Sequence, residues 1–172
     1  MLISSFLLEN EAQPFTQLLS ENKTTLQSST WDSHVSSLGV DGNFLTSQHT
    51  HQARINSEKQ YWWVDLGAVE LVESVLLFHQ TGYSGRFKNV EFFLSNTTYS
   101  ADDASFSENK CDHVGDSIAW LSAGSGLLLY NSTTCHGVGR YFTLLMTGYH
   151  HDAHLHLREV QVFGEGKQLF SI

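Results

Sequence analysis

A short polar segment near the start of the chain has the residue types of a cation-binding loop. Asp41-Gly42-Asn43 places a carboxylate and an amide on either side of a glycine. A glycine readily takes the left-handed conformation, and in such a tight turn the two side-chain oxygens converge. Ca²⁺ binds carboxylate, amide and backbone oxygens on irregular loops of this kind. Taken alone, the tripeptide is more often an ordinary turn.

A break in the hydrophobic alternation singles out a second acidic residue, near the other end of the chain. Apolar residues fall on odd positions in Leu155–Leu157 and on even positions in Val160–Val162. Because side chains alternate with a period of two along a strand, this phase change predicts a β-bulge at Arg158-Glu159. Such a bulge would leave a carbonyl unpaired and redirect the carboxylate of Glu159. The alternative is register noise in an edge strand.

The chain has ten histidines, and four of them are close together: His150, His151, His154 and His156. His154 and His156 fall on one face of an expected strand, a spacing that can hold Zn²⁺, but no third and fourth ligand is identifiable. A pH switch is a second interpretation, because several imidazoles would charge together below about pH 6. The interpretation we favour is that these histidines are solvated loop residues.

The sequence has no arrangement typical of an enzyme. It has no glycine-rich phosphate loop, no nucleophile elbow and no His-Glu-x-x-His motif. A glycosidase needs two carboxylates flanking one bond, and nothing in the sequence places two together. Asp65 follows Trp62-Trp63 on an apolar strand and is expected to be a structural hydrogen-bond acceptor. We therefore predict a binding module rather than an enzyme.

Length, composition and charge are those of one folded domain. The 172 residues are 41% hydrophobic and 12% aromatic, enough for one good core and too little for two. The formal net charge of −9 repels phosphate backbones and anionic membrane surfaces. Nucleic acid and membranes are therefore not expected partners, and no apolar stretch approaches the length of a transmembrane helix.

Cysteines and glycosylation motifs favour an oxidising compartment. The two cysteines, Cys111 and Cys135, are best explained as one disulfide, although two free thiols in a cytosolic protein are the alternative. Three Asn-x-Ser/Thr motifs begin at Asn22, Asn96 and Asn131. The first eight residues lack the basic segment and the apolar length of a signal peptide, so we expect the signal to have been removed. Together these features predict a secreted protein or the ectodomain of a cell-surface protein.

The chain has the pattern of short β-strands separated by turns. Segments rich in Gly, Ser, Asn and Asp, such as residues 81–85 and 122–126, separate the apolar runs. Strands are expected at Tyr61–Leu66, Leu71–Phe78, Asn89–Leu94, Ser117–Leu121, Leu127–Tyr130, Arg140–Met146 and Leu155–Phe163. Only residues 1–20 show the weak periodicity of a helical turn. This pattern predicts an all-β sandwich or barrel.

An ordered series of sequence blocks resembles the F-type lectin (fucolectin) domain, within the wider discoidin and coagulation factor C-domain-like superfamily. The blocks are Asn22–Thr30, Val40–Asn43, Tyr61–Gly67, Gly139–Phe142 and Leu155–Gly164. The resemblance covers residues 18–164, leaving an N-terminal extension at 1–17 and a C-terminal tail at 165–172. It implies an eight-stranded antiparallel jelly-roll β-sandwich, like that of galactose-binding domains, with the binding loops at one end.

The resemblance implies a structural Ca²⁺ and a disulfide. The metal ligands that it transfers to this chain are the side chains of Asp41, Asn43 and Glu159, backbone carbonyls near Leu38 and Arg158, and a ligand near Thr50. The predicted bulge falls on the residues that this site needs. Calcium would hold long loops against the sandwich and stabilise it. Pairing of Cys111 with Cys135 matches a disulfide found in many F-type domains.

The sugar-binding residues of the family are only partly matched. Fucose recognition in the family uses a histidine, an arginine followed by an aspartate, and a second basic residue. Gln80 and Gly82 stand where the first arginine and the aspartate are expected, and Arg86 stands near the second basic position. The histidine position falls on His49 or His51. The candidate ligand-binding residues are therefore His51, Arg54, His79, Gln80, Tyr83 and Arg86, with Tyr83 as a stacking face.

Two functions follow from this reasoning. The first is an extracellular carbohydrate-recognition domain with a degenerate fucose motif, which binds glycans of cell surfaces or glycoproteins. The alternative is a protein–protein adhesion module on the same fold, with a protein receptor as its partner and the sugar pocket lost. Oligomers or repeated domains, through which many family members gain avidity, are compatible with either function.

Overall fold

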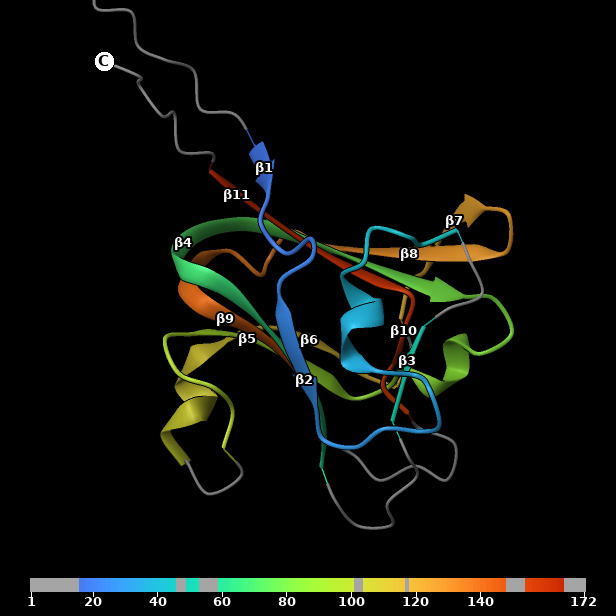
Figure 1. Cartoon of the computed structure of the whole chain (residues 1–172), viewed down its shortest axis with the longest axis horizontal. Helices are drawn as coiled ribbons and strands as arrows, with labels where there is room; N and C mark the ends of the chain where they lie inside the picture. Colours follow the sequence, from blue (N-terminus) through green and yellow to red (C-terminus); the bar gives the residue numbers. More distant parts are fainter. Residues whose placement is uncertain are drawn as a thin grey trace, which may run out of the picture.

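The computed structural model of the chain describes residues 16–45, 49–52, 59–100, 104–116, 118–147 and 154–165, and they are almost entirely β (Figure 1). The strands are β1 (Thr16–Leu18), β2 (Thr24–Gln27), β3 (Thr50–His51), β4 (Gln60–Gln80), β5 (Val90–Ser95), β6 (Lys110–Val114), β7 (Leu121–Gly124), β8 (Leu127–Ser132), β9 (Gly137–Met146), β10 (His156–Leu157) and β11 (Glu159–Glu165). Three short 3₁₀ helices are η1 (Ser36–Gly39), η2 (Ser84–Arg86) and η3 (Ala104–Asn109).

The long strand β4 organises the fold, because its two halves pair with different neighbours. The first half pairs with β2 and with the end of β9, and the second half pairs with β11 and β8. Between the halves, Gly67 has a φ of +90° and the register shifts between Asp65 and Glu70. β4 and β9 therefore bend together, on the left of Figure 1, and carry the chain from one layer to the other. The sequence predicted two separate strands here.

All strand pairs are antiparallel, which confirms the predicted sandwich. The main sheet has the order β1-β11-β4-β9-β5-β6, with β2 and β8 on β4 and β7 on β8. β3 and β10 form a separate two-stranded sheet. The described chain has more strands than the eight expected, partly because β1, β3 and β10 are only two or three residues long. Thr16 pairs with Glu165, slightly beyond the predicted domain limits.

Apolar side chains from both halves of β4 meet in one core. Trp62 and Val64 from the first half and Val75 and Leu77 from the second are fully buried. β5, β9 and β11 complete this core with residues such as Phe92, Phe142, Leu144, Val160 and Val162. A smaller cluster of Phe93, Phe106 and Leu145 lies beside η3. Among the residues described, no helix is long and apolar enough to cross a membrane.

The phase change before the last strand is real, but it is not a bulge within one strand pair. His156 and Leu157 pair with β3, whereas Glu159 and the residues after it pair with β4. Arg158 lies between the two pairings, and its backbone N–H donates to the carbonyl of Phe78 at 2.9 Å. The hydrophobic phase therefore changes because the chain changes partner. The register shift within β11 lies between Phe163 and Gly164 instead.

Two other expectations about local structure are corrected. The strand expected at 117–121 does not form at residues 118–120. β7 begins at Leu121, the last residue of that expected strand, and runs into the segment expected to be a turn, 122–126. β6 was not expected. It begins at Lys110 and carries Cys111, which forms the predicted disulfide with Cys135. The bond joins β6 to the segment before β9, with 4.5 Å between the two Cα atoms.

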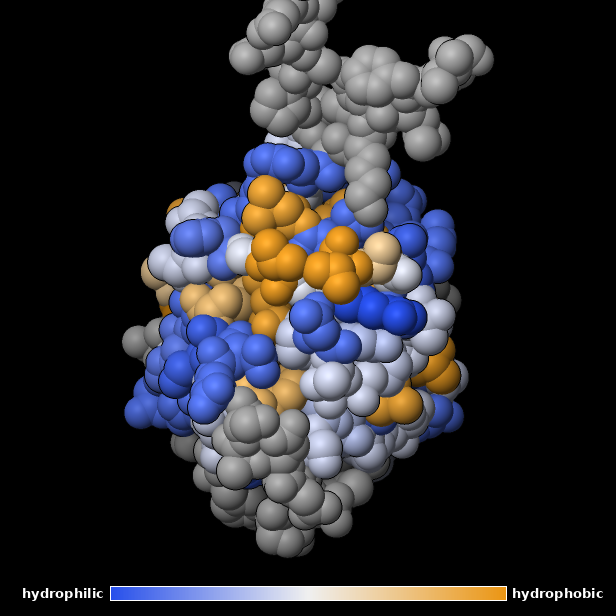
Figure 2. Space-filling model, turned by 90° about the vertical axis from the view of Figure 1, so that its left-hand side faces the viewer, coloured by the Kyte–Doolittle hydropathy of each residue, from blue (hydrophilic) through white to orange (hydrophobic). Residues whose placement is uncertain are grey.

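Apolar side chains gather at the β4–β9 bend, which faces the viewer in Figure 2. Val69 and Leu71 of β4 and Val138 of β9 are all exposed there. Leu71 and Val138 are partners on the paired strands, so they lie next to each other.

The three sequon asparagines, Asn22, Asn96 and Asn131, are also exposed, as a glycosylated residue must be. Their glycosylation stays a prediction.

Candidate functional site

The Asp-Gly-Asn segment forms the predicted tight turn directly after η1. Asp41 Oδ1 accepts a hydrogen bond from the backbone N–H of Asn43 at 2.9 Å, and Gly42 has a φ of +74°. The backbone N–H of Gly42 donates to Glu159 Oε1 at 3.3 Å. The loop near the start of the chain and the acidic residue near its end are therefore in contact, as the family resemblance implied.

Glu159 is a buried acid whose second oxygen is not satisfied. Its side chain is fully buried, and Oε2 has no hydrogen-bond partner among the described residues. Burial and then the negative charge of Asp41 raise the pKa of Glu159 to about 8, and Glu21 adds to the effect. Glu21 also reaches the loop, since a Cβ on Gly42 would lie 2.9 Å from its Oε1. An unsatisfied carboxylate beside two others is suited to a bound cation.

The remaining predicted metal ligands lie around the same loop. Thr50 is buried, and its hydroxyl oxygen accepts from the backbone N–H of Leu157 at 3.2 Å. Leu38 lies in η1, which packs against β3 and β11. The guanidinium of Arg158 donates to the carbonyl of Phe44 at 3.4 Å, and burial lowers the pKa of Arg158. In the described part of the chain, no three His, Cys, Asp or Glu side chains are arranged to hold a metal, so a cation here would need amide and backbone oxygens as well.

The predicted sugar-binding residues meet at the end of the sandwich where β4 stops. His79 and Gln80 are the last residues of β4, Tyr83 directly precedes η2, and Arg86 is the last residue of η2. The guanidinium carbon of Arg86 lies 4.4 Å from the centre of the Tyr83 ring. His51 joins them from β3, and Arg54 lies outside the described residues. β3 and β10 lie together on the right of Figure 1, away from the β4–β9 bend.

A cluster of imidazoles fills the space between these elements, and sequence reasoning did not find it. The members are His34, His49, His51, His79, His154 and His156. Ring centres are 3.9 Å apart for His49 and His156, 5.0 Å for His79 and His156, and 5.2 Å for His51 and His154.

The expectation that the histidines near the end of the chain are solvated is therefore wrong for two of them. His154 and His156 are only 8% and 1% exposed. They are buried because the chain on which they lie passes between β3 and β4 to reach β11, and the pairing of β10 with β3 sets His156 opposite His51. His150 and His151 lie outside the described residues.

Burial disfavours the charged form of three of these imidazoles. Burial first, and then nearby imidazoles and Arg86, lower the pKa of His51 to about 4. Burial also lowers the pKa of His79 to about 4, although its hydrogen bond to the Gln80 carbonyl acts in the opposite direction. The pKa of His156 is lowered by burial and then by nearby imidazoles and Arg86. His79 Nδ1 donates to the carbonyl of Gln80 at 3.0 Å, while neither ring nitrogen of His156 has a partner among the described residues. At neutral pH the described part of the cluster therefore places uncharged His51, His79 and His156 beside the guanidinium of Arg86.

Two exposed aromatic rings flank the cluster. Tyr83 is 40% exposed, and its ring centre lies 5.4 Å from that of His156. Trp31 is 54% exposed, and its ring centre lies 6.1 Å from that of His51. The backbone N–H of Trp31 donates to the backbone carbonyl of His51 at 2.9 Å. Sequence reasoning missed Trp31, although a tryptophan in a polar segment is a usable signal. An aromatic face that remains open to solvent is suited to stack against the apolar face of a sugar.

The position of the family aspartate has no side chain here. Gly82 has a φ of +89°, and a Cβ at this residue would meet no atom within 4 Å. Gln80, at the position of the first arginine, is partly buried. At the two positions where the resemblance to F-type lectins implies an aspartate and an arginine, this chain therefore has a glycine beside open space and a neutral amide.

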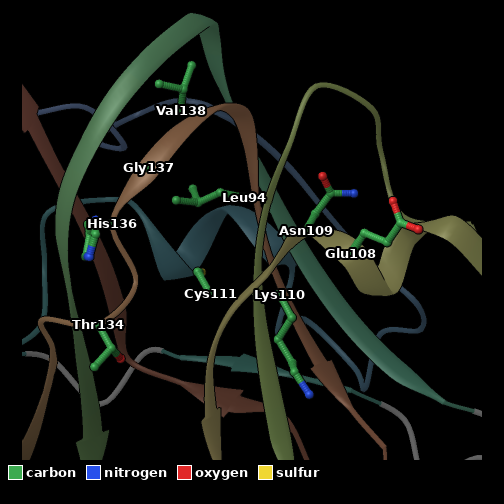
Figure 3. Close-up of a pocket in the computed structure, with 9 residues that line it drawn as sticks. All are labelled: Leu94, Glu108, Asn109, Lys110, Cys111, Thr134, His136, Gly137 and Val138. Carbon is green, nitrogen blue, oxygen red and sulfur yellow. The ribbon is translucent and has the colours of Figure 1, made fainter.

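A separate depression lies between β5, β6 and β9, next to the disulfide (Figure 3). Its volume is about 390 Å³, and its walls include Leu94, Lys110, His136 and Val138. Apart from Leu94 the walls are mostly exposed, and Lys110 is paired with Glu91 at 3.2 Å. This depression contains none of the predicted ligand-binding residues.

Solved structures with the same fold are sugar-binding proteins. A fucolectin from striped bass serum has a TM-score of 0.70 and 22% identity, over 89% of this chain and 49% of that protein. A fucose-binding module of Streptococcus pneumoniae has a TM-score of 0.64 and 22% identity, over 87% and 96%. A chitosan-binding module of Paenibacillus sp. IK-5 has a TM-score of 0.64 and 19% identity, over 86% and 99%.

The fold is therefore the discoidin-like β-sandwich of the F-type lectins, as the sequence blocks predicted. This chain spans about half the length of the striped bass fucolectin. No family model matches the sequence, and no curated protein matches it either. The likeness, at these identities, shows the fold.

Proposed function

We propose that this chain is an extracellular carbohydrate-recognition domain that binds glycans at the end of the sandwich carrying the imidazole cluster. The observation that supports this function best is the pair of exposed rings, Trp31 and Tyr83, on either side of His51 and His156. Binding faces for small ligands combine such apolar surfaces with a few polar groups that fix orientation. The fucolectin and the fucose- and chitosan-binding modules of the same fold support a sugar as the ligand.

Each group has a defined part in this proposal. The faces of Trp31 and Tyr83 would contact the apolar face of a sugar ring, and Arg86 would donate to its oxygen atoms. His51 Nε2 has no partner among the described residues and is buried, so a sugar hydroxyl would reach it only after the neighbouring rings shift. Ordinary fucose recognition is not expected, because Gln80 and Gly82 replace the charged pair that it uses.

A glycan-array screen of the protein tests this function. We expect a defined set of glycans to bind, and Trp31→Ala and Tyr83→Ala to lose that binding. Val138→Ala is the matched control, because Val138 is an exposed apolar residue on the opposite bend. Absence of any glycan signal, together with a protein ligand whose binding survives both aromatic substitutions, would instead establish the adhesion-module alternative.

We also propose that a structural Ca²⁺ binds at the Asp41–Asn43 loop. The unsatisfied oxygen of Glu159 and the carboxylates around it support this site. The cation would neutralise Glu159 and join the loop after η1 to the start of β11. Asp41, Asn43 and Glu159 would supply side-chain oxygens, and Leu38, Thr50 and Arg158 would supply the remaining ligands.

Melting temperatures with and without Ca²⁺ test the calcium site. Chelation should lower the melting temperature of the native protein, and Glu159→Gln should abolish this response because it removes the carboxylate that would bind the cation. Glu73→Gln is the control, since Glu73 is an exposed acid on β4 that hydrogen-bonds Thr16. An unchanged melting temperature of the native protein after chelation would show that the calcium site does not exist.

A further inference from the structure

Arg140 and Arg86, two arginines outside the calcium loop, make different side-chain contacts. Arg140 donates from Nε and Nη2 to the two carboxylate oxygens of Asp65, each at 2.8 Å. Arg86 lies over the ring of Tyr83 and forms no ion pair or hydrogen bond with a carboxylate of the described residues. Among the described residues, no carboxylate therefore competes with a ligand for the Arg86 guanidinium.

The groups that surround Arg86 do not provide the missing negative charge. The charged groups acting on His51 are Arg86 and the imidazoles of His154, His49 and His34. Those acting on His79 and His156 are again imidazoles and arginines, including Arg158. Tyr83 contributes an uncharged ring. Among the described residues, the charges that act on the three imidazoles beside Arg86 thus come only from imidazoles and arginines.

A neutral sugar is a poor match for such a site. Its hydroxyl groups are donors as well as acceptors, and a carboxylate beside the arginine is the usual acceptor for them. That carboxylate is missing at Gly82, where the space is open. A ligand that carries its own acid group would supply both the negative charge and the acceptor oxygens that the guanidinium fork matches.

On the basis of the proposed function, we infer that the preferred ligand is a glycan bearing a single acid group, a carboxylate or a sulfate, and that Arg86 binds this group. The aromatic rings of Trp31 and Tyr83 would hold the neighbouring sugar. The ring of His156 is next to that of Tyr83, with 5.4 Å between the ring centres. Its two nitrogens have no partner among the described residues, and one of them carries an N–H that could donate a hydrogen bond. The formal charge of −9 on the whole chain disfavours polyanions, which limits the ligand to an isolated acid group.

The affinity of the full chain for lactose and for two acidic derivatives of lactose tests this inference. We use 3′-sialyllactose, 3′-sulfolactose and lactose, with fucose as a fourth ligand, and measure affinity by calorimetry at pH 7.5. At least one acidic ligand should bind ten-fold or more tightly than lactose, and the carboxylate and sulfate arms show which acid is preferred. That preference should weaken in high salt, because it is a charge interaction.

Two substitutions of Arg86 locate the effect. Arg86→Gln should remove the preference for acidic ligands, whereas Arg86→Lys should keep part of it, because the charge remains and the fork is lost. Lys110→Gln, in the depression beside the disulfide, should bind like the native protein. A melting curve for each variant confirms that it is folded.

The outcomes separate this inference from the function on which it rests. If neutral fucose or lactose binds as tightly as the acidic ligands, or if Arg86→Gln keeps the preference, the acid-group inference is wrong while glycan binding stands. If none of the four ligands binds and the glycan array is also empty, both are wrong. Loss of the preference in Lys110→Gln would move the site to the other depression and overturn the assignment of Arg86.

Discussion

The polar side chains at the two ends of the sandwich differ in whether they have hydrogen-bond and ion-pair partners. At the β4–β9 bend, Asp65 accepts two hydrogen bonds from Arg140 and one from the backbone N–H of Gly67. Arg140 lowers the pKa of Asp65, which is the mark of a carboxylate stabilised in its charged form. The expectation that Asp65 has a structural role is thereby confirmed. This end also carries the disulfide between Cys111 and Cys135.

At the opposite end, polar groups are buried without such partners. Glu159 has a raised pKa, His51 and His79 have lowered pKa values, and Arg86 has no carboxylate partner in the described chain. Burial of Glu159, His51 and His79 costs stability in the free protein, because their charged forms are disfavoured or their hydrogen bonds are incomplete. The bend thus stabilises the fold, whereas the loop end holds the groups that we propose bind a ligand.

The largest expected effect is the loss of the disulfide. Replacing both Cys111 and Cys135 by serine should lower the free energy of unfolding by about 3 kcal/mol, because the unfolded chain is no longer constrained over the loop between them. Denaturant unfolding measures this change. Glycan affinity of the folded variant should stay the same, since the bond lies away from the imidazole cluster. A variant that loses glycan affinity while still folded would contradict the separation of the two ends.

A second, slightly smaller effect is an acid-dependent loss of stability at the loop end. The pKa of His79 is about 4 in the folded protein and about 6.5 when it is unfolded. As the pH falls through 6.5, the unfolded chain takes up a proton that the folded protein does not, so stability decreases until about pH 4. For a buried residue such as His79 the shift corresponds to about 3 kcal/mol or less.

The contribution of His79 is isolated by substitution. His79→Leu should flatten part of the decrease in the free energy of unfolding between pH 6.5 and 4. His113→Gln is the control, because His113 is exposed on β6. Equal pH profiles for the native protein and His79→Leu would show that burial of this imidazole carries no acid sensitivity.

How much of this arrangement the sequence predicts depends on whether a feature is local. The Asp41–Asn43 turn depends on adjacent residues, and the all-β pattern depends on short-range alternation, so both were predicted and confirmed. The contact with Glu159 was predicted only through the family resemblance. Gly67 permits β4 to bend without ending, and nothing in the local pattern separates this bend from a loop between two strands.

The imidazole cluster could not be predicted in this way. Its members come from the segments around His34, around His49 and His51, at His79, and around His154 and His156. They meet because β3 and β10, each only two residues long, pair with each other. Strands of this length have no measurable periodicity, so the sequence does not reveal their register. Burial of His156 follows from that pairing and not from any feature of its neighbours.

The smallest expected effects concern two ion pairs away from the cluster. Asp65→Asn keeps the shape of the side chain but weakens the paired hydrogen bonds from Arg140. Since Arg140 is partly exposed, the free energy of unfolding should fall by only about 1 kcal/mol. Lys110→Gln breaks the more exposed pair with Glu91 and should cost less than about 0.5 kcal/mol.

Denaturant unfolding of both variants, beside a glycan titration, ranks the two pairs. The bidentate geometry predicts that Asp65→Asn is the more costly change, and neither variant should alter glycan affinity. If Asp65→Asn has the same free energy of unfolding as the native protein, the paired hydrogen bonds between Asp65 and Arg140 do not contribute to stability. The stabilising role assigned to the bend would then rest on the disulfide and on the packing of β4 against β9 alone.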